Sequence, residues 1–377
     1  MCSSDLAARG VSDAGGYFYL PLLSPGLYKV RAEANGFQAQ ETQDLNLPVA
    51  GRVEIDFRLR PLNDVWEAGV YNSVFLPGSR TIVTFFGPDV DTSRSGSFEA
   101  QKGRYHLYVS YSCPWAHRTL IMRAFKGLES MIGVSAVNSH MGAEGWTFAP
   151  GPETVADDVN HVQRIHELYT LADPAYSGRA TIPILWDKHE RTIVSNESAE
   201  ILRMLNSAFD AVGANRNDYY PAELRAEIDE WNALIYPNVN NGVYRAGFAT
   251  TQEAYVEAAT AVFAALDRIE KHLATRRYLC GARLTEADVR LFATLIRFDP
   301  VYHGHFKCNL RRIVDYPNLW GFVRDLYQTP GVAPTVHVDF IKRHYYGSHP
   351  TINPTRIVPV GPALDYLAPH GRWGLSG

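Results

Sequence analysis

The segment from Tyr105 to Leu128 constrains the fold more than any other part of the chain. An alternating strand pattern covers residues 105–110, and apolar residues at helical spacing follow between Leu120 and Leu128. Pro114 lies between the two patterns, where it suits the first residue of a helix because a missing N–H costs nothing there. The segment therefore predicts a strand, a tight turn and a helix, with Cys113 as the helix N-cap.

A cysteine at a helix N-cap has a special electrostatic environment. Unsatisfied backbone N–H groups and the positive end of the helix dipole would face the Cys113 sulfur, which lowers a thiol pKa from about 8.5 toward about 3.5 to 7.5. We therefore predict that Cys113 is a nucleophile with a lowered pKa, the alternative being a buried, inert thiol. Cys280 and Cys308 lack this context and are interpreted as structural.

Length, charge and hydropathy limit the class of protein. The 377 residues allow two or three domains. Lys and Arg number 36 and Asp and Glu 40, a formal charge of −4 without a basic run, so we expect neither nucleic acid nor an anionic membrane as a partner. The sequence has no apolar stretch of membrane-spanning length and no standard signal peptide, which predicts a cytoplasmic protein. The four cysteines fit neither a disulfide framework nor a CxxC metal site.

The first sixty residues differ from the rest, because residues 15–59 show short strand patterns and turns. They resemble a carboxypeptidase regulatory-like β-sandwich module through Asp13-Ala14-Gly15-Gly16-Tyr17, Pro25-Gly26-Leu27-Tyr28 and Gly36-Phe37. The opening Met1-Cys2-Ser3-Ser4-Asp5-Leu6 also looks like a translated sequencing-adapter end. Residues 1–60 are thus either a native β-rich fragment or an artefact of gene assembly. In both cases we expect them to carry no catalysis.

The next part of the chain continues the pattern begun by the Cys113 segment. A second strand is predicted over 134–137, a helix over 159–172, and a strand over 181–186 that contains Pro183. Such a proline is a cis-proline next to the active cysteine in thioredoxin-like folds, and it would turn the Ile182 backbone toward an extended peptide. Residues 61–207 are therefore predicted to form a thioredoxin-like α/β domain.

A polar helix start follows at Ser195-Asn196-Glu197-Ser198. Glu197 could accept hydrogen bonds from an α-ammonium group, while Ser198 and its backbone N–H could donate to an α-carboxylate. The same residues could also be a plain helix cap, and the two roles are compatible.

The second half of the chain is predicted to be a helix bundle over residues 208–377. Apolar residues repeat at helical spacing in two segments, and Thr285-Glu286-Ala287-Asp288 has the pattern of a capping box. Three aromatic segments, 240–248, 297–306 and 344–346, are predicted to be loops that line a pocket for a flat ring. His303, His305 and Cys308 match no zinc pattern well, so no metal is predicted.

Together these motifs carry a family resemblance. From about Ser97 to Pro362 the chain resembles the Xi-type glutathione transferases, the S-glutathionyl-hydroquinone reductases. The resemblance rests on residues 103–108, Cys113-Pro114-Trp115-Ala116-His117-Arg118, Gly145-Trp146, residues 195–198, residues 240–244, Arg297-Phe298-Asp299 and Asn353-Pro354-Thr355. The segment from Val65 to Ser97 departs from the family pattern.

The resemblance implies a glutathione transferase fold, a homodimer and glutathione as co-substrate, with no metal. Glutathione would be bound by Trp146, Arg179, Ala180, Thr181, Ile182, Pro183, Glu197 and Ser198. Tyr244 would be the general acid or base at a hydroquinone ring, while Tyr302 and Tyr345 would donate hydroxyls to the Cys113 sulfur and lower its pKa further.

The expected reaction is the reduction of glutathionyl-hydroquinones through a Cys113–glutathione mixed disulfide, which a second glutathione resolves. Two alternatives stay open. One is an omega-type thiol transferase or dehydroascorbate reductase that uses the same cysteine, and the other is a non-enzymatic module with a transferase-like fold.

Overall fold

The computed structural model describes residues 98–375 except 175, 177 and 178, together with the backbone of six short strands between residues 26 and 61. Those strands form three antiparallel pairs: β1 (Gly26–Tyr28) with β5 (Leu45–Leu47), β2 (Arg31–Ala32) with β4 (Gln40–Glu41), and β3 (Phe37–Gln38) with β6 (Arg60–Pro61). The rest of the predicted β-rich fragment, and the segment 62–97, lie outside the described residues.

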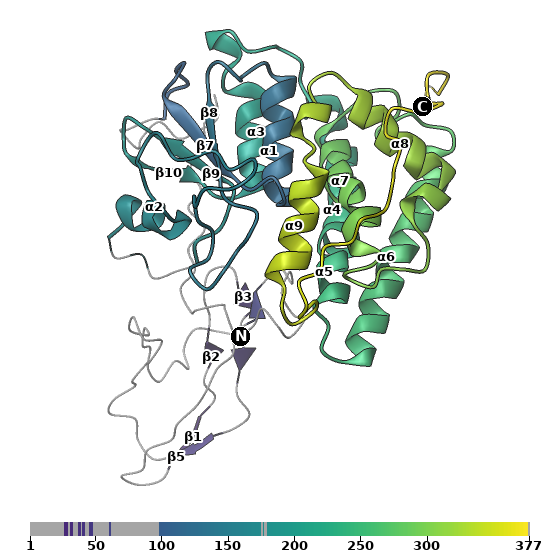
Figure 1. Cartoon of the computed structure of the whole chain (residues 1–377), viewed down its shortest axis with the longest axis horizontal. Coiled ribbons are helices and arrows are strands. Elements are labelled where there is room, and N and C mark those ends of the chain that lie inside the picture. The colour runs from purple at the N-terminus through teal and green to yellow at the C-terminus, as the bar shows by residue number, and fades with distance from the viewer. Residues whose placement is uncertain are drawn as a thin grey trace.

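A four-stranded mixed sheet forms the first half of the described chain (Figure 1). It contains β7 (Tyr105–Val109), β8 (Gly133–Ala136), β9 (Ile184–Asp187) and β10 (Thr192–Ser195), in the order β10-β9-β7-β8. β7 is parallel to β8 and antiparallel to β9, and β9 is antiparallel to β10. The predicted strand over 181–186 begins only at Ile184, because a cis peptide bond joins Ile182 to Pro183 just before it.

Alternation along β7 decides which helices cover each face of the sheet. Tyr105, Leu107 and Val109 pack in one cluster with α1 (Pro114–Phe125) and α3 (Ser198–Ser207), while Tyr108 packs on the other face with α2 (Ile165–Ala172). In Figure 1, α1 and α3 accordingly lie between the sheet and the helical half, and α2 lies on the far side.

Helix α2 is shorter than predicted. The Asp157 carboxylate accepts hydrogen bonds from the backbone N–H groups of Val159, Asn160 and Val162. This carboxylate-centred turn satisfies those N–H groups locally, so the helix starts only at Ile165.

The second half is helical, as the apolar spacing predicted. Its long helices are α4 (Arg225–Ile235), α6 (Gln252–Leu273), α7 (Glu286–Arg297), α8 (Pro317–Gln328) and α9 (Val338–Ser348), with the short α5 (Gly242–Gly247). One-turn helices lie at η1 (Asp210–Val212), η2 (Ala222–Leu224), η5 (Ile313–Asp315) and η6 (Ala333–Thr335), and π-helical turns at η3 (Tyr236–Asn240) and η4 (Phe298–Tyr302). The predicted capping box is present, since Asp288 accepts from the Thr285 N–H and hydroxyl.

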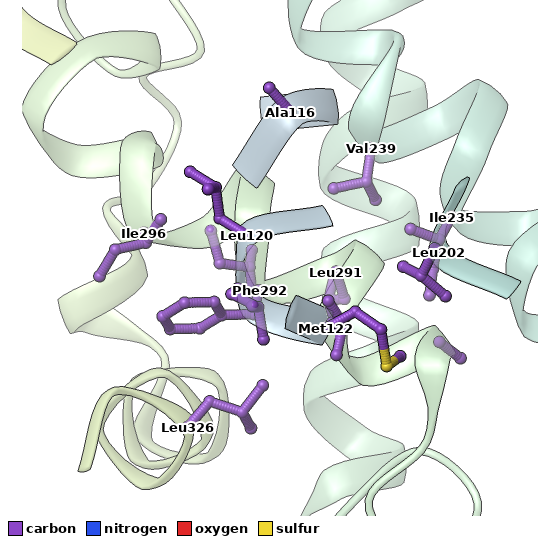
Figure 2. Close-up of a cluster of buried hydrophobic side chains, with 14 of the residues drawn as sticks. Ala116, Leu120, Met122, Leu202, Ile235, Val239, Leu291, Phe292, Ile296 and Leu326 are labelled. Atoms are coloured by element: carbon purple, nitrogen blue, oxygen red, sulfur yellow. The ribbon is translucent and has the colours of Figure 1, made fainter. Parts of the chain in front are cut away.

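The two halves share one apolar core. Figure 2 shows the contact region, where Leu120 of α1 lies beside Phe292 of α7 and Met122 of α1 lies beside Leu291 of α7, with Leu202 of α3 and Leu326 of α8 nearby. Every residue of α7 is buried, so this helix is the centre of the helical half and at the same time a neighbour of α1.

The prediction that three aromatic segments are loops is wrong. Tyr244 lies in α5, Tyr302 ends the π-helical turn η4, and Tyr345 lies in α9. Gly242 explains why the first segment can be helical, because a Cβ there would lie 2.8 Å from the Val262 side chain of α6. The glycine in this segment thus allows close helix packing and does not mark a loop.

Candidate active site

Cys113 is the N-cap of α1, as predicted. Its sulfur accepts a hydrogen bond from the Ala116 N–H at 3.4 Å and lies 3.8 Å from the backbone oxygen of Ile182. Pro114 is the first residue of the helix, and the side chain of Cys113 is half-buried. The cis Ile182–Pro183 bond therefore lies beside the cysteine, as the sequence predicted.

The expected lowering of the Cys113 pKa is not found. Burial raises the pKa of the thiol, and this effect is larger than the opposing effects of the Ala116 and Trp115 N–H groups and of the Arg297 and Arg118 guanidinium groups. The helix N-terminus acts in the expected direction, but local sequence patterns do not predict how closely the surrounding side chains enclose the sulfur. The largest effects that lower the pKa of Cys113 thus come from backbone N–H groups and guanidinium groups.

Hydrogen bonds to Tyr169 of α2 hold the segment that leads into Pro183. The Tyr169 hydroxyl donates to the Thr181 backbone oxygen at 2.9 Å and accepts from the Thr181 N–H at 3.1 Å, and Asn196 donates to the same hydroxyl. The Arg179 backbone oxygen accepts from Tyr176 at 2.8 Å. Ala180 packs against the same apolar cluster as Ile182, so this stretch is fixed against the sheet beside Cys113.

Glu197 and Ser198 begin α3. The Glu197 carboxylate accepts from the Ala199 N–H at 3.0 Å and from the Ser198 hydroxyl at 3.4 Å, which is the capping role that the sequence allowed. Ser198 is buried, and Arg118 donates to its hydroxyl at 3.5 Å. Glu197 is partly exposed and keeps its carboxylate available to a ligand.

Trp146 lies in the loop after β8 and stacks on His344 of α9, with ring centroids 4.8 Å apart. The same loop is tied to α9 by a hydrogen bond between His344 and the Ser139 backbone oxygen at 3.0 Å and by one from the Met141 N–H to Ser348 at 2.9 Å. Trp146 and Cys113 both pack against the apolar cluster that contains Ile182. Helix α9 thus joins the predicted glutathione side to the helical half (Figure 1).

The structure brings the three predicted tyrosines together. The Tyr345 hydroxyl bonds to the Tyr244 hydroxyl and, at 3.0 Å, to the Tyr302 hydroxyl. The rings of Trp115 and Tyr244 have centroids 5.1 Å apart, which places the phenols next to the turn that carries Cys113. The hydroxyls of Tyr302 and Tyr345 are thus paired within this cluster.

Burial raises the pKa of all three phenols, and the neighbouring tyrosines add to this for Tyr244 and Tyr345. A negative charge on Cys113 raises the pKa of Tyr244 and Tyr302 further. The phenols therefore remain protonated at neutral pH and can serve as hydrogen donors when the sulfur is ionised.

Three buried polar side chains in the site were missed as functional residues. Arg118 of α1 and Arg297 at the end of α7 are almost completely buried and lower the pKa of Cys113, and His117 accepts a hydrogen bond from Arg297. The sequence does contain a signal, because each arginine stands at a position where the helical pattern predicts an inward-facing apolar residue.

His303, His305 and Cys308, which were considered above as metal ligands, do not form a cluster with one another. His305 bonds to His349 at 3.1 Å, and burial lowers the pKa of His305 to about 4. Cys308 and Cys280 are buried with raised pKa values of about 12, in agreement with structural roles. Among residues 98–375, as far as the structure describes them, no group of three His, Cys, Asp or Glu side chains is placed to hold a metal ion.

A cavity of about 550 Å³ lies elsewhere, between η4, α8 and the C-terminal segment. It is lined by Asp299, Arg324 and Pro362, among other residues, and by none of the predicted site residues. In the same described part of the chain no helix has the length and apolar character needed to cross a bilayer.

Known proteins resemble this chain in sequence and fold. Residues 112–208 match the family described as "Glutathione S-transferase, N-terminal domain", and residues 225–325 match "Glutathione S-transferase, C-terminal domain". The chain is 62% identical over 266 residues to the glutathionyl-hydroquinone reductase PcpF of Sphingobium chlorophenolicum. The matched region covers 71% of this chain and 85% of PcpF. The chain belongs to the glutathione S-transferase family.

Two further comparisons concern YqjG of Escherichia coli, a second glutathionyl-hydroquinone reductase. It is 59% identical over 279 residues, covering 74% of this chain and 85% of YqjG. The glutathione-bound structure of YqjG superposes with a TM-score of 0.74 and 56% identity, over 78% of this chain and 96% of that one. Residues 3–60 of this transferase match the carboxypeptidase regulatory-like domain. The predicted domain limits at 60 and 207 stay predictions.

Proposed function

We propose that this protein reduces glutathionyl-hydroquinones to hydroquinones, with glutathione as the reductant. The observation that carries the proposal is the position of Cys113, which lies between the Ile182–Pro183 turn on one side and a cluster of three protonated phenols on the other. The sulfur would act as the nucleophile, the backbone beside it would bind an extended peptide, and the phenols would serve as acids beside an aromatic ring. This combination suits a glutathione thioether of an aromatic ring. The activity named for PcpF and YqjG supports the same substrate class.

On the glutathione side, we assign each predicted residue a contact with the tripeptide. The Ile182 backbone would pair with the extended tripeptide, and Thr181, Ala180 and Arg179 continue this edge. Glu197 would accept from the ligand's ammonium group, and the start of α3 at Ser198 would receive its carboxylate. Trp146, which stacks on His344 of α9, would form one wall of the glutathione site.

The first chemical step is attack by the Cys113 thiolate on the sulfur of the thioether. The new S–S bond forms as the S–C bond to the ring breaks, and the electron pair of that bond leaves with the ring carbon. Tyr244 supplies a proton to this carbon, so the ring departs as hydroquinone. The ring gains two electrons, and the two sulfur atoms are oxidised to a mixed disulfide.

A second glutathione completes the cycle. Its thiolate attacks the glutathionyl sulfur of the mixed disulfide, which releases oxidised glutathione and the Cys113 thiolate. The raised pKa of Cys113 leaves only a small thiolate fraction at neutral pH, but a thiolate of higher pKa is intrinsically more nucleophilic. The reaction therefore proceeds through a minor but reactive form of the cysteine.

The proposal also includes the setting of the reaction. A catalytic cycle that passes through a mixed disulfide needs reduced glutathione and a reduced cysteine, and both favour the cytoplasm. Cys113, Cys280 and Cys308 are free thiols in the structure. We further propose a homodimer, as the family resemblance implies, which light scattering on purified protein tests directly.

The decisive experiment replaces Cys113 by serine and follows two substrates. With glutathionyl-hydroquinone, the wild-type protein should gain a glutathione adduct on the peptide that contains Cys113, and Cys113→Ser should lose both the adduct and hydroquinone release. Retention of most of the activity by Cys113→Ser would refute the mechanism. A higher rate on the mixed disulfide of glutathione with β-hydroxyethyl thiol than on glutathionyl-hydroquinone would instead favour the omega-type thiol transferase.

A further inference from the structure

Arg297 is a buried cation without a carboxylate partner among the residues that the structure describes. Its side chain at the end of α7 is fully buried, and none of the described acidic side chains lies within ion-pair distance of it. A buried charge is costly unless other groups compensate it, so an unpaired one in a core calls for a specific reason.

The guanidinium bonds mainly to the turn that presents Cys113. Its Nε donates to the Ser112 backbone oxygen at 2.8 Å and its Nη2 to the Tyr111 backbone oxygen at 2.9 Å. Its Nη1 donates to the Ala293 oxygen in its own helix at 2.7 Å and to Nδ1 of His117 at 2.9 Å. One side chain of the helical half thus fixes the two residues before the cysteine and a residue one turn after it.

His117 extends this network in a defined protonation state. Because Arg297 can only donate, Nδ1 of His117 must be unprotonated, and its Nε2–H then donates to the Thr335 hydroxyl at 2.9 Å. Thr335 in turn donates to the Val332 backbone oxygen at 2.6 Å. Burial and the neighbouring Arg297 lower the pKa of His117 well below its usual range, so the imidazole is neutral and does not neutralise the guanidinium.

The charged groups around the sulfur are few. Arg118 approaches from α1 and Arg297 from α7, while the phenols of Tyr244 and Tyr302 are neutral. Glu197 of α3 interacts with Arg118. Arg118 donates to Asn240 at the end of η3 and to Ser198 at the start of α3. Of the two cations, Arg297 is therefore the one whose hydrogen bonds converge on the turn before Cys113.

We propose that Arg297 is a positioning residue of the Cys113 site: it holds the turn that presents the sulfur and supplies the buried positive charge that balances the thiolate. The role in turnover rests on the function proposed above, whereas the role in forming the thiolate does not. In accordance with this proposal, Arg297 contributes more than Arg118 to lowering the pKa of Cys113.

The test measures how the rate of Cys113 alkylation by iodoacetamide depends on pH, by mass spectrometry of the peptide that contains Cys113. Arg297→Met should move the midpoint of this profile upward by about one pH unit, which is about a tenfold loss of rate at pH 7, as expected for a unit charge several ångströms away in a medium of effective dielectric constant about 20. Arg297→Lys keeps the charge but not the fork of donors, so its midpoint should lie between those of the wild type and Arg297→Met.

Arg372 provides a matched control. It is also almost completely buried without a carboxylate in ion-pair contact among the described residues, and it donates to the backbone oxygens of Leu273, Arg277 and Asn318, far along the chain from the cysteine. Arg372→Met should lower thermal stability as Arg297→Met does, but it should leave the alkylation midpoint unchanged.

The outcomes separate the hypotheses. If Arg297→Met folds and reacts with the wild-type pH profile, the charge role of Arg297 is overturned. If Arg297→Lys reacts with the wild-type profile, the role of the donor fork in holding the turn is overturned, and this result also decides that role when Arg297→Met does not fold. Because alkylation needs neither glutathione nor a quinone, a failure of the proposed reductase activity would leave this result intact.

Discussion

Replacing Tyr244 by phenylalanine removes one oxygen atom from the phenol cluster and should separate ring protonation from sulfur chemistry. Tyr345 would lose its bond to Tyr244 but would keep its 3.0 Å bond to Tyr302, so the cost in folding free energy should be about 1 kcal/mol. The catalytic cost should be larger, because a positioned general acid contributes about 10²-fold or more. A loss of 10²-fold corresponds to about 2.7 kcal/mol in the activation barrier.

The assay compares two reactions of the same cysteine. Formation of the Cys113–glutathione disulfide from glutathionyl-hydroquinone in a single turnover should slow by at least about 10²-fold in Tyr244→Phe. Alkylation of Cys113 by iodoacetamide requires no proton transfer to a ring and should remain near the wild-type rate. Tyr255→Phe, which removes a phenol that bonds to the Lys307 backbone oxygen outside the cluster, is the control and should change neither rate. A normal single-turnover rate in Tyr244→Phe would refute the assigned role.

Three more predictions follow from the contacts of single residues. Because burial raises the pKa of Cys113, the thiolate fraction should still be increasing at pH 9, so the alkylation rate of the free protein should keep rising there; a plateau below pH 8 would contradict this. Glu197→Gln keeps an acceptor for the Ala199 N–H but loses the charge, so the KM for glutathione should rise about tenfold with little change in kcat, as steady-state kinetics can show. Phe292→Ala empties a fully buried site between α1 and α8 and should lower the free energy of unfolding by about 3 to 5 kcal/mol in denaturant titrations; an unchanged midpoint would mean that the site is not packed as described.

Local patterns predicted the parts of the fold that depend on neighbours in sequence. The N-cap at Cys113, the cis bond before Pro183 and the capping box at Thr285 each depend on a few adjacent residues, and each is present. The boundaries of α2 were harder to predict, because the Asp157 carboxylate takes up N–H groups that the apolar spacing assigned to the helix.

The site was less predictable wherever it depends on residues distant in sequence. The grouping of Tyr244, Tyr302 and Tyr345 came from the family resemblance, and their helical setting was not expected. The pKa of Cys113 was predicted in the wrong direction, since the enclosure that raises it comes from elements far away along the chain. Arg297 lies 184 positions after Cys113, and only the folded structure shows that its donors reach the turn before the cysteine.

Helix α1 is covered by the sheet on one side and by α7 on the other, and this arrangement determines how the protein unfolds. Neither half can complete its own interior when separated, because each would expose the face of α1 or α7 that the other covers. The described region should therefore melt as one cooperative unit, and a protease nick in the connecting segment near Gly213 should leave two fragments that stay associated. The two halves match separate family models, yet each depends on the other for its interior, and Cys113 lies at the start of a helix that packs in both.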